Sequence, residues 1–226
     1  MSFFICLFKL NLKLVYLFLK ILPTNKNKIV FISRQSNNIP IDFSILAKNL
    51  REKKYKVIII AKKIDSGLIN YLKYYFNLYL QMYHLATSKV CIIDSYCIPV
   101  CILKHKKKLV IIQIWHAMAA IKQFGYQTLT KDSGRNEKIA KIMCMHKNYS
   151  YILSGSENMI QPFSKAFNTP TNKIIVNGLP RVDYIMHNKK SLSKSIRKDY
   201  KKLNHKKNIL YAPTFRPNND YKINEV

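Results

Sequence analysis

The sequence predicts an α/β fold, a Rossmann-like parallel sheet preceded by an amphipathic helix. After Pro23, short apolar runs rich in β-branched residues alternate with helix-like stretches, which is typical of parallel strands joined by helices. The runs lack polar alternation, as expected for strands that are buried on both faces. With 226 residues, 48% hydrophobic composition, 5 Gly and 8 Pro, the chain is neither disordered nor collagen-like.

Residues 3–22 are apolar except for Asn11 and three lysines, and Pro23 ends the segment. On a helical wheel most polar positions fall within about 60° of one another. They are Ser2, Lys9, Lys13, Tyr16 and Lys20. A spanning helix would place Lys9 and Lys13 near mid-bilayer, at about 2.5–3.5 kcal/mol each. We therefore predict that 1–22 is an interfacial membrane helix whose Lys9, Lys13 and Lys20 contact anionic lipids. A helix buried against the following domain is the alternative.

The remaining elements follow from the alternation of apolar runs and helix-like stretches. The predicted strands are 28–33, 56–60, 89–94, 109–114, 151–154, 173–177 and 208–212. The predicted helices are 41–54, 67–83, 136–146 and 157–167. The Lys-rich stretch 188–207 is expected to be a linker or an exposed helix. Only 14 residues follow the last strand, so 208–226 is expected to begin a domain whose remainder is absent.

The net charge of +28 comes from 39 basic and 11 acidic residues. Six of the basic residues are Arg and the other 33 are Lys. This charge fits either a solvated Lys-rich surface or attraction to a polyanion such as acidic lipid or a phosphate polymer. Because Arg makes most bidentate base contacts, its scarcity argues against sequence-specific DNA reading, and we expect no nucleic-acid partner.

The five cysteines show no disulfide framework and no paired CxxC spacing. We predict no metal site and interpret these cysteines as buried free thiols in a reducing compartment. The chain also lacks the P-loop, the dinucleotide-binding fingerprint and the nucleophile elbow, so no cofactor is evident.

Polar residues recur where the predicted strands end. In parallel sheets the carboxyl ends of the strands bind ligands. The clusters are Ser33 to Ser36, Asp94 with Ser95, Trp115 with His116, Ser154-Gly155-Ser156, and Gly178 with Pro180 and Arg181. Together they predict one polar rim.

Three of these clusters contain candidate site residues, each with a structural alternative. His116 suits general-base chemistry, or it is a satisfied structural histidine. Ser154-Gly155-Ser156 presents backbone N–H groups to an anion, or Ser156 is simply an N-cap. Arg181 grips a phosphate, or it pairs with Asp183.

Four segments in order resemble one family. They are IWHAMAAIKQFGY (114–126), HKNYSYILSGSENMIQPFSKAFN (146–168), NGLPRVDYI (177–185) and ILYAPTFR (209–216). They resemble the Trp-His-Gly/Ala motif, the Ser-Ser or Ser-Pro segment, the Gly-x-Pro-Arg-x-Asp turn and the Leu-Tyr-Ala-Pro-Thr strand-turn of the CDP-glycerol:poly(glycerophosphate) glycerophosphotransferases of teichoic acid and capsule synthesis. The sequence departs from that pattern at Ala117, Ala119 and Ala120.

The resemblance implies an enzyme that transfers glycerol phosphate or ribitol phosphate from a CDP-alditol to a hydroxyl of a lipid-linked or polymeric acceptor, releasing CMP. It implies His116 as the base. It places Arg181 and Arg216 near the donor phosphates. We assign Ser154, Gly155, Ser156 and Gly178 to the same phosphate site because they belong to the predicted polar rim. The resemblance also implies a peripheral location at the cytoplasmic face of the cell membrane.

The implied architecture is the amino-terminal half of a GT-B fold. On this interpretation 23–187 is the first Rossmann-like domain, 188–207 a basic linker and 208–226 the start of an incomplete donor-binding domain. The chain alone is then expected to have little or no activity. Two alternatives stay open, a GT-B glycosyltransferase that uses a nucleotide sugar and a non-catalytic basic fragment that binds membranes or polyanions.

Overall fold

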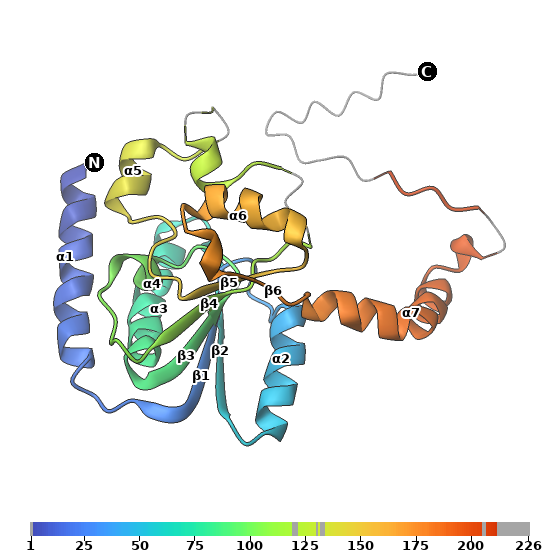
Figure 1. The fold of residues 1–226 in the computed structure, drawn as a ribbon, viewed down its shortest axis with the longest axis horizontal. Helices are drawn as coiled ribbons and strands as arrows, with labels where there is room; N and C mark the ends of the chain where they lie inside the picture. Colours follow the sequence, from blue (N-terminus) through green and yellow to red (C-terminus); the bar gives the residue numbers. More distant parts are fainter. Residues whose placement is uncertain (1, 119–121, 130, 132–133, 205–206, 212–226) are drawn as a thin grey trace. The chain divides into compact units, whose positions relative to one another are not determined.

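A computed structural model describes residues 2–118, 122–129, 131, 134–204 and 207–211, and Figure 1 shows the order of the elements. The α-helices are α1 (Ser2–Leu19), α2 (Ile41–Glu52), α3 (Leu68–Thr87), α4 (Ile98–Ile102), α5 (Glu137–Ile142), α6 (Ile160–Phe167) and α7 (Pro180–Asp199). The strands are β1 (Asn25–Ser33), β2 (Lys56–Ala61), β3 (Ser88–Ile93), β4 (Val110–Gln113), β5 (Tyr151–Ser154) and β6 (Ile174–Val176). Four short 3₁₀ helices are η1 (Gly125–Thr128), η2 (Glu157–Met159), η3 (Thr171–Lys173) and η4 (Lys201–Leu203).

The strands form one six-stranded sheet in the order β2-β1-β3-β4-β5-β6, and every neighbouring pair is parallel. This confirms the predicted α/β fold with a Rossmann-like parallel sheet. The chain leaves β1 toward one edge of the sheet to form β2 and then returns past β1 to form β3. The sheet therefore has a topological switch point between β1 and β3, where such sheets bind ligands.

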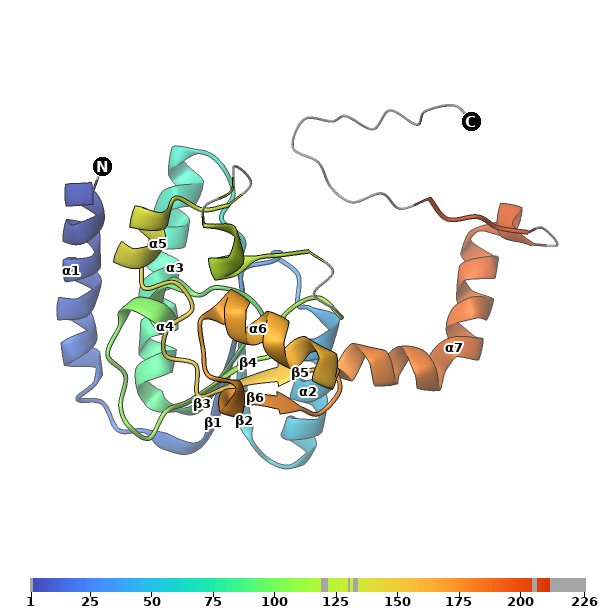
Figure 2. The same cartoon turned by 45° about the horizontal axis from the view of Figure 1, so that its top comes forward.

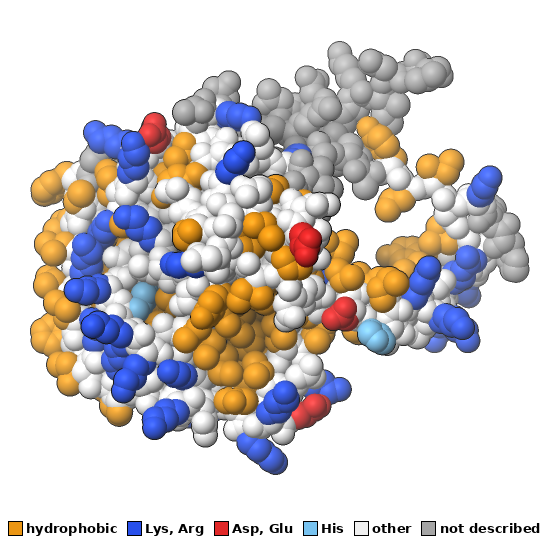
Figure 3. Space-filling view, viewed as in Figure 1, with side chains coloured by type: hydrophobic (Ala, Val, Ile, Leu, Met, Phe, Trp, Pro, Cys, Tyr) orange, Lys and Arg blue, Asp and Glu red, His pale blue; other side chains and the backbone are white. Residues whose placement is uncertain are grey.

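Alternate residues of each strand enter two cores on opposite faces of the sheet. On one face Phe31 of β1 packs against Phe43 of α2, with ring centroids 5.0 Å apart. On the other face Val30 and Ile32 join the larger core under α1, α3 and α4. Figure 2 shows α2 alone on its side of β1 and β2. Beyond α2, Tyr151, Ile175 and Val176 of β5 and β6 remain exposed, and Figure 3 shows an apolar patch on this face.

Helix α1 docks on the domain through a face that includes Leu12, Tyr16 and Lys9. Leu12 and Tyr16 are buried, and the Tyr16 hydroxyl bonds to His105 Nδ1 at 2.8 Å. Lys9 Nζ donates to the carbonyl of Ile142 and contacts Cys144 Sγ. The prediction that the lysines of this helix face lipid headgroups is therefore wrong for Lys9, because one carbonyl group and one thiol of the domain contact its ammonium. Lys13 is exposed and Lys20 half-buried.

The opposite face of α1 is apolar and exposed. Its exposed residues are Phe3, Phe4, Leu7, Leu10, Leu14, Leu17 and Phe18. Next to it, α3 contacts α1 through hydrogen bonds from Tyr75 and Tyr79 to Asn11. Among the described residues, no helix has the length and apolar character that crossing a bilayer requires.

Other boundaries differ from the prediction in ways that have local causes. The helix expected over 136–146 ends at Ile142 because Cys144 and His146 adopt positive φ values of 50° and 59°. The strand expected over 208–212 is wrong over 208–211, which lie outside any strand, and Ala212 is outside the described residues. Of the cysteines, Cys91, Cys97 and Cys101 are buried free thiols as predicted; Cys6 is exposed and Cys144 half-buried.

The carboxyl-terminal part of the chain is described separately. Residues 1–184 form one compact unit and residues 185–226 another. The Lys-rich stretch predicted as a linker or an exposed helix is helical in α7 as far as Asp199, and α7 has no buried residue. The predicted boundary after residue 187 falls within this helix, and the division into domains stays a prediction.

Candidate active site

The polar residues that follow β1, β3 and β4 meet at the switch point of the sheet. Ser33 Oγ donates to Asp94 Oδ2 at 2.7 Å, and the backbone N–H of Arg34 donates to Ser95 Oγ at 3.3 Å. His116 reaches the same place from the end of β4. The predicted polar rim therefore exists between β1, β3 and β4.

His116 is held through one ring nitrogen. Its Nδ1 lies 3.0 Å from the carbonyl oxygen of Asp94 and 3.2 Å from Nε2 of Gln35. The two contacts require opposite roles of Nδ1, because the carbonyl only accepts and the amide nitrogen donates. We assign the proton to Nδ1 on the shorter contact. The carbonyl then fixes the tautomer, and Nε2 is left as the proton acceptor.

Trp115 aims His116 through an uncommon backbone conformation. Its φ is +59°, which lies in the left-handed region of backbone conformation. A bulky residue that adopts this conformation loses about 1–3 kcal/mol of stability. The Trp115 backbone N–H donates to Gln113 Oε1 at 2.8 Å. Its ring stacks on Phe124 with centroids 4.2 Å apart and lies 4.0 Å from the His116 ring. The turn thus anchors the indole in an aromatic cluster and directs the next residue, His116, to the rim.

Asp94 is almost completely buried beneath the rim. Its Oδ2 accepts from Ser33 and its Oδ1 from Ser95 at 2.9 Å. Burial raises the pKa of this carboxyl, and the two serine hydrogen bonds and His116 lower it in part. Asp94 therefore rigidifies the loop whose carbonyl holds His116.

Arg181 is paired with Asp42, a partner far from it in the sequence. Its backbone N–H donates to Asp42 Oδ1 at 2.9 Å and its Nε to Oδ2 at 2.7 Å; Nη2 contacts the same oxygen. Its Nη1 donates to the carbonyl of His116 at 2.9 Å. Asp42 is buried in the first turn of α2. Arg181 thus ties α2, the start of α7 and the His116 loop together.

The segment Ser154-Gly155-Ser156 has the structure of an N-cap. Ser156 Oγ accepts from the N–H of Asn158 at 3.3 Å and caps η2, and Ser154 Oγ donates to the carbonyl of Ser156 at 2.7 Å. A Cβ on Gly155 would lie 3.3 Å from Leu179, so a larger residue there would require the Leu179 side chain to shift slightly. Gly178 has φ +71°, which favours glycine before α7. Arg216 lies outside the described residues.

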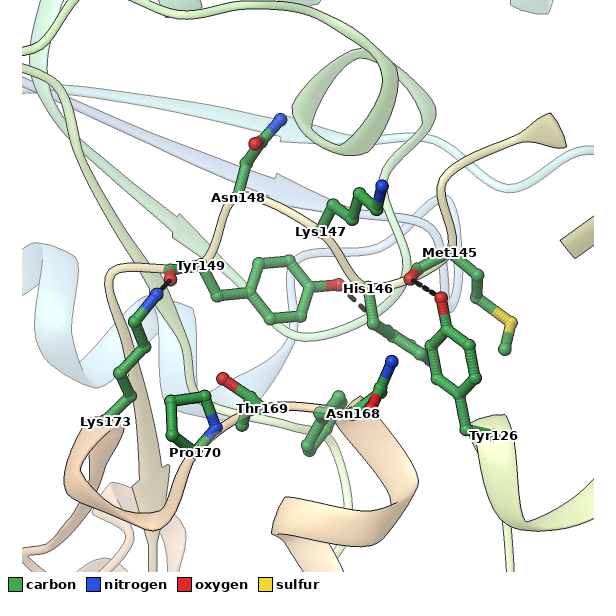
Figure 4. Close-up of a pocket in the computed structure, with 11 residues that line it drawn as sticks. Tyr126, Met145, His146, Lys147, Asn148, Tyr149, Asn168, Thr169, Pro170 and Lys173 are labelled. Atoms are coloured by element: carbon green, nitrogen blue, oxygen red, sulfur yellow. Dashed lines mark hydrogen bonds between the residues drawn. The ribbon is translucent and has the colours of Figure 1, made fainter. Parts of the chain in front are cut away.

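A cavity of about 200 Å³ lies away from this rim, and Figure 4 shows the side chains around it. His146 and Tyr149 point toward each other, with Nδ1 3.0 Å from the hydroxyl. Burial, aided by the charge of Arg135, lowers the pKa of His146 to about 3. None of the predicted site residues lines this cavity, and the paired, neutral His146 stabilises the loop before β5.

Sequence reasoning placed Gln35 and Asp94 in the predicted polar rim, but it did not single out Asp42 as a partner of the site. Gln35 and Asp94 carried a signal, because both lie at the carboxyl ends of predicted strands. Asp42 carried none, since it lies inside a predicted helix far from Arg181 in sequence. Among the described residues, no group of three or more His, Cys, Asp or Glu side chains is arranged to hold a metal ion.

Several known proteins are similar to this chain. It is 33% identical over 199 residues to the teichoic acid ribitol-phosphate primase of Bacillus spizizenii. The match covers 87% of this chain and 51% of that protein. It is 34% identical over 146 residues to the teichoic acid glycerol-phosphate primase of Bacillus subtilis, covering 64% of this chain and 36% of that protein. The chain thus spans about half the length of the first of these relatives and less of the second.

The fold is also that of a solved structure. A variant of the wall teichoic acid polymerase TagF matches with a TM-score of 0.64 at 19% identity, over 86% of this chain and 49% of that one. The model of one family, CDP-glycerol:poly(glycerophosphate) glycerophosphotransferase, matches residues 14–225 and so includes the His116 loop and the Arg181 turn. This chain therefore belongs to the CDP-glycerol:poly(glycerophosphate) glycerophosphotransferase family.

Proposed function

We propose that this chain carries the acceptor-activating part of a transferase that moves glycerol phosphate or ribitol phosphate from a CDP-alditol to a hydroxyl. The acceptor is a lipid-linked or polymeric polyol phosphate in teichoic acid or capsule synthesis. The similarity to teichoic acid primases and polymerases supports this substrate class. The observation that carries the proposal is the 3.0 Å contact between His116 Nδ1 and the Asp94 carbonyl at the switch point of the sheet, from which we assign the tautomer.

In the proposed reaction His116 Nε2 takes the proton of the acceptor hydroxyl. The acceptor oxygen forms a bond to the alditol-bearing phosphorus, and the bond from that phosphorus to the CMP oxygen breaks. A positioned base of this kind contributes typically 10²–10⁴-fold to the rate. The Asp94 carbonyl stabilises the imidazolium that results, because it accepts the Nδ1 hydrogen throughout.

The contacts of Arg181 in the structure change the role that we propose for this residue. Three of its donors bind Asp42 and the His116 carbonyl, so we assign it to positioning the His116 loop. Ser154, Gly155, Ser156 and Gly178 stay proposals for donor phosphate binding that rest on the predicted polar rim, and Arg216 stays one that rests on the resemblance. The cap made by Ser156 leaves the 154–156 backbone well ordered for such a contact.

The exposed apolar face of α1 supports a peripheral membrane location. Phe4, Leu14 and Phe18 are 72%, 50% and 71% exposed on this face. Figure 3 shows Lys and Arg side chains beside the apolar edge, an arrangement suited to anionic headgroups around a buried apolar face. We propose that this face, at the cytoplasmic side of the membrane, lies in the lipid interface with Lys13 and Lys20 near headgroups.

A chimera tests the donor class. Residues 14–226 of this chain replace the matching segment of the ribitol-phosphate primase, and product release is measured with CDP-ribitol, CDP-glycerol and UDP-glucose. We expect CMP release from a CDP-alditol in the presence of a lipid-linked acceptor and no UDP release. A folded chimera that turns over only the UDP-sugar would favour the glycosyltransferase alternative. A folded chimera without any turnover would favour the non-catalytic alternative.

A further inference from the structure

A second cavity, of about 160 Å³, lies beside the candidate active site. Arg34 and Arg135 supply its charged groups and Tyr96 its aromatic ring, while Ile139, Met145 and similar side chains form apolar walls. A small pocket with two cations among apolar groups suits an anion that is attached to a less polar moiety.

The two guanidinium groups share the Tyr96 ring. Arg34 Cζ lies 5.6 Å from the ring centroid and Arg135 Cζ lies 5.1 Å from it. Within the described part of the chain, no Asp or Glu forms an ion pair with either arginine. Two like charges therefore face one ring with no carboxylate among the described residues paired to either, an arrangement that an oxyanion would stabilise.

Arg34 is fixed but incompletely satisfied. Its Nη1 donates to the carbonyl of Tyr96 at 2.9 Å, which holds the guanidinium in place. Its Nε is buried and has no hydrogen-bond partner in the described part of the chain. A buried donor left unpaired costs about 1–3 kcal/mol, and such groups are often explained by a missing ion or water. The unpaired donor of Arg34 thus also points to an anionic ligand.

The cavity adjoins the proposed base. Gln35, the residue after Arg34, contacts His116, and Tyr96 lies two residues after Asp94, whose carbonyl holds His116. An anion bound between the arginines would therefore lie near the hydroxyl that His116 deprotonates.

The cavity also adjoins the membrane-facing helix. Helix α5 lines it through Ile139, and Lys9 of α1 binds the carbonyl of Ile142 at the end of α5. Figures 1 and 2 both show α5 beside the amino-terminal part of α1. An acceptor that is anchored in a membrane under α1 would pass α5 and this cavity on its way to His116.

We propose that Arg34 and Arg135 bind a phosphate group of the acceptor, one linkage behind the hydroxyl that reacts. The inference rests on the proposed function and adds an acceptor-binding subsite to the candidate active site. The shared chemistry is a phosphodiester or diphosphate; it comes either from the polyol-phosphate chain or from the lipid diphosphate that anchors it.

Binding to the complete chain tests this without turnover. Methyl-labelled methionines report the ligand, since Met143 and Met145 line the cavity and Met186 lies in the other compact unit. The probes are glycerophosphoglycerol, for the polyol-phosphate source, and farnesyl diphosphate, for the lipid source. We expect saturable shifts of Met143 and Met145 with at least one probe, and the tighter probe identifies the source.

Arg135→Gln is the decisive variant because Arg135 is exposed and makes no hydrogen bond within the described part of the chain. It should weaken binding about tenfold, or about 1.4 kcal/mol. Arg51→Gln, the same charge change at an exposed position on α2, should leave binding unchanged. Equal weakening by both variants, or no shift at Met143 and Met145, overturns the proposal. Because CDP-alditol turnover is measured separately in the chimera, this failure is distinct from failure of the proposed function.

Discussion

Arg181 and Asp42 form an ion pair that is linked to the proposed base, because the same guanidinium donates to the carbonyl of His116. The Asp42 side chain is 5% exposed and that of Arg181 25%. Removing one partner of a largely buried pair leaves the other charge uncompensated.

Arg181→Ala should therefore destabilise the protein by about 3 kcal/mol, or roughly 6–12 °C in melting temperature at this chain length. The double variant Arg181→Ala/Asp42→Ala should recover part of the loss, because it leaves no unpaired carboxylate. Thermal melts of the two single variants and the double variant measure the coupling. Additive losses would show that the pair does not act as a unit.

Asp94→Asn should stabilise the protein at neutral pH. Burial raises the pKa of this carboxyl, so the folded state favours its protonated form. The stability that the protonated carboxyl contributes is fully present below pH 3.8, the ordinary pKa of Asp. It is lost as the pH rises through the folded-state pKa. Asn still offers an oxygen to Ser33. Melts at pH 4 and pH 7.5 should show the gain mainly at the higher pH; a loss at pH 7.5 would mean that the charge is needed for stability.

His105 should make the docking of α1 sensitive to acid. Its Nε2 lies 2.8 Å from the Val100 carbonyl, which requires a proton there, so Nδ1 accepts from Tyr16. Burial lowers the pKa of His105 to about 4, and the stability that depends on the neutral form is lost as the pH falls from 6.5 through 4.

His105→Gln removes this titration while it keeps one donor and one acceptor. The melting temperature of this variant should fall less between pH 7 and pH 4.5 than that of the unaltered chain. Because His84 also has its pKa lowered to about 4 by burial, part of the acid sensitivity should remain. Identical pH profiles for the variant and the unaltered chain would exclude His105 as a source of it.

The apolar face of α1, rather than Lys9, should control membrane binding. Leu7→Gln/Leu14→Gln removes two exposed leucines from one helix face and should weaken binding to phosphatidylglycerol vesicles about tenfold. Leu210→Gln, at an exposed leucine in the other compact unit, is the matched control. Lys9→Glu should lower the melting temperature, since Lys9 binds the carbonyl of Ile142. If vesicle flotation shows unchanged binding of the double variant, that result would contradict a lipid-facing α1.

Local sequence patterns predicted the strands of the sheet well. They predicted poorly which side chains form hydrogen-bonded pairs. The strand over 28–33 was found from its β-branched run, and its position in the sheet order follows from parallel βαβ connections. Arg181 and Asp42 are separated by 139 positions, and no local signal links them. The lysine arc of α1 was recognised, yet Lys9 donates to the carbonyl of Ile142 on α5 instead of facing headgroups, since tertiary contacts decide which face of an amphipathic helix docks.

The turnover of a His116→Asn chimera tests the central claim most directly. Asn keeps a donor near the position of Nδ1, so its contact with the Asp94 carbonyl and its melting temperature should persist, while the base is lost. The account predicts a fall in turnover of about 10²–10⁴-fold with CDP-alditol binding nearly unchanged. A folded His116→Asn chimera that releases CMP at nearly the rate of the unsubstituted chimera would contradict it.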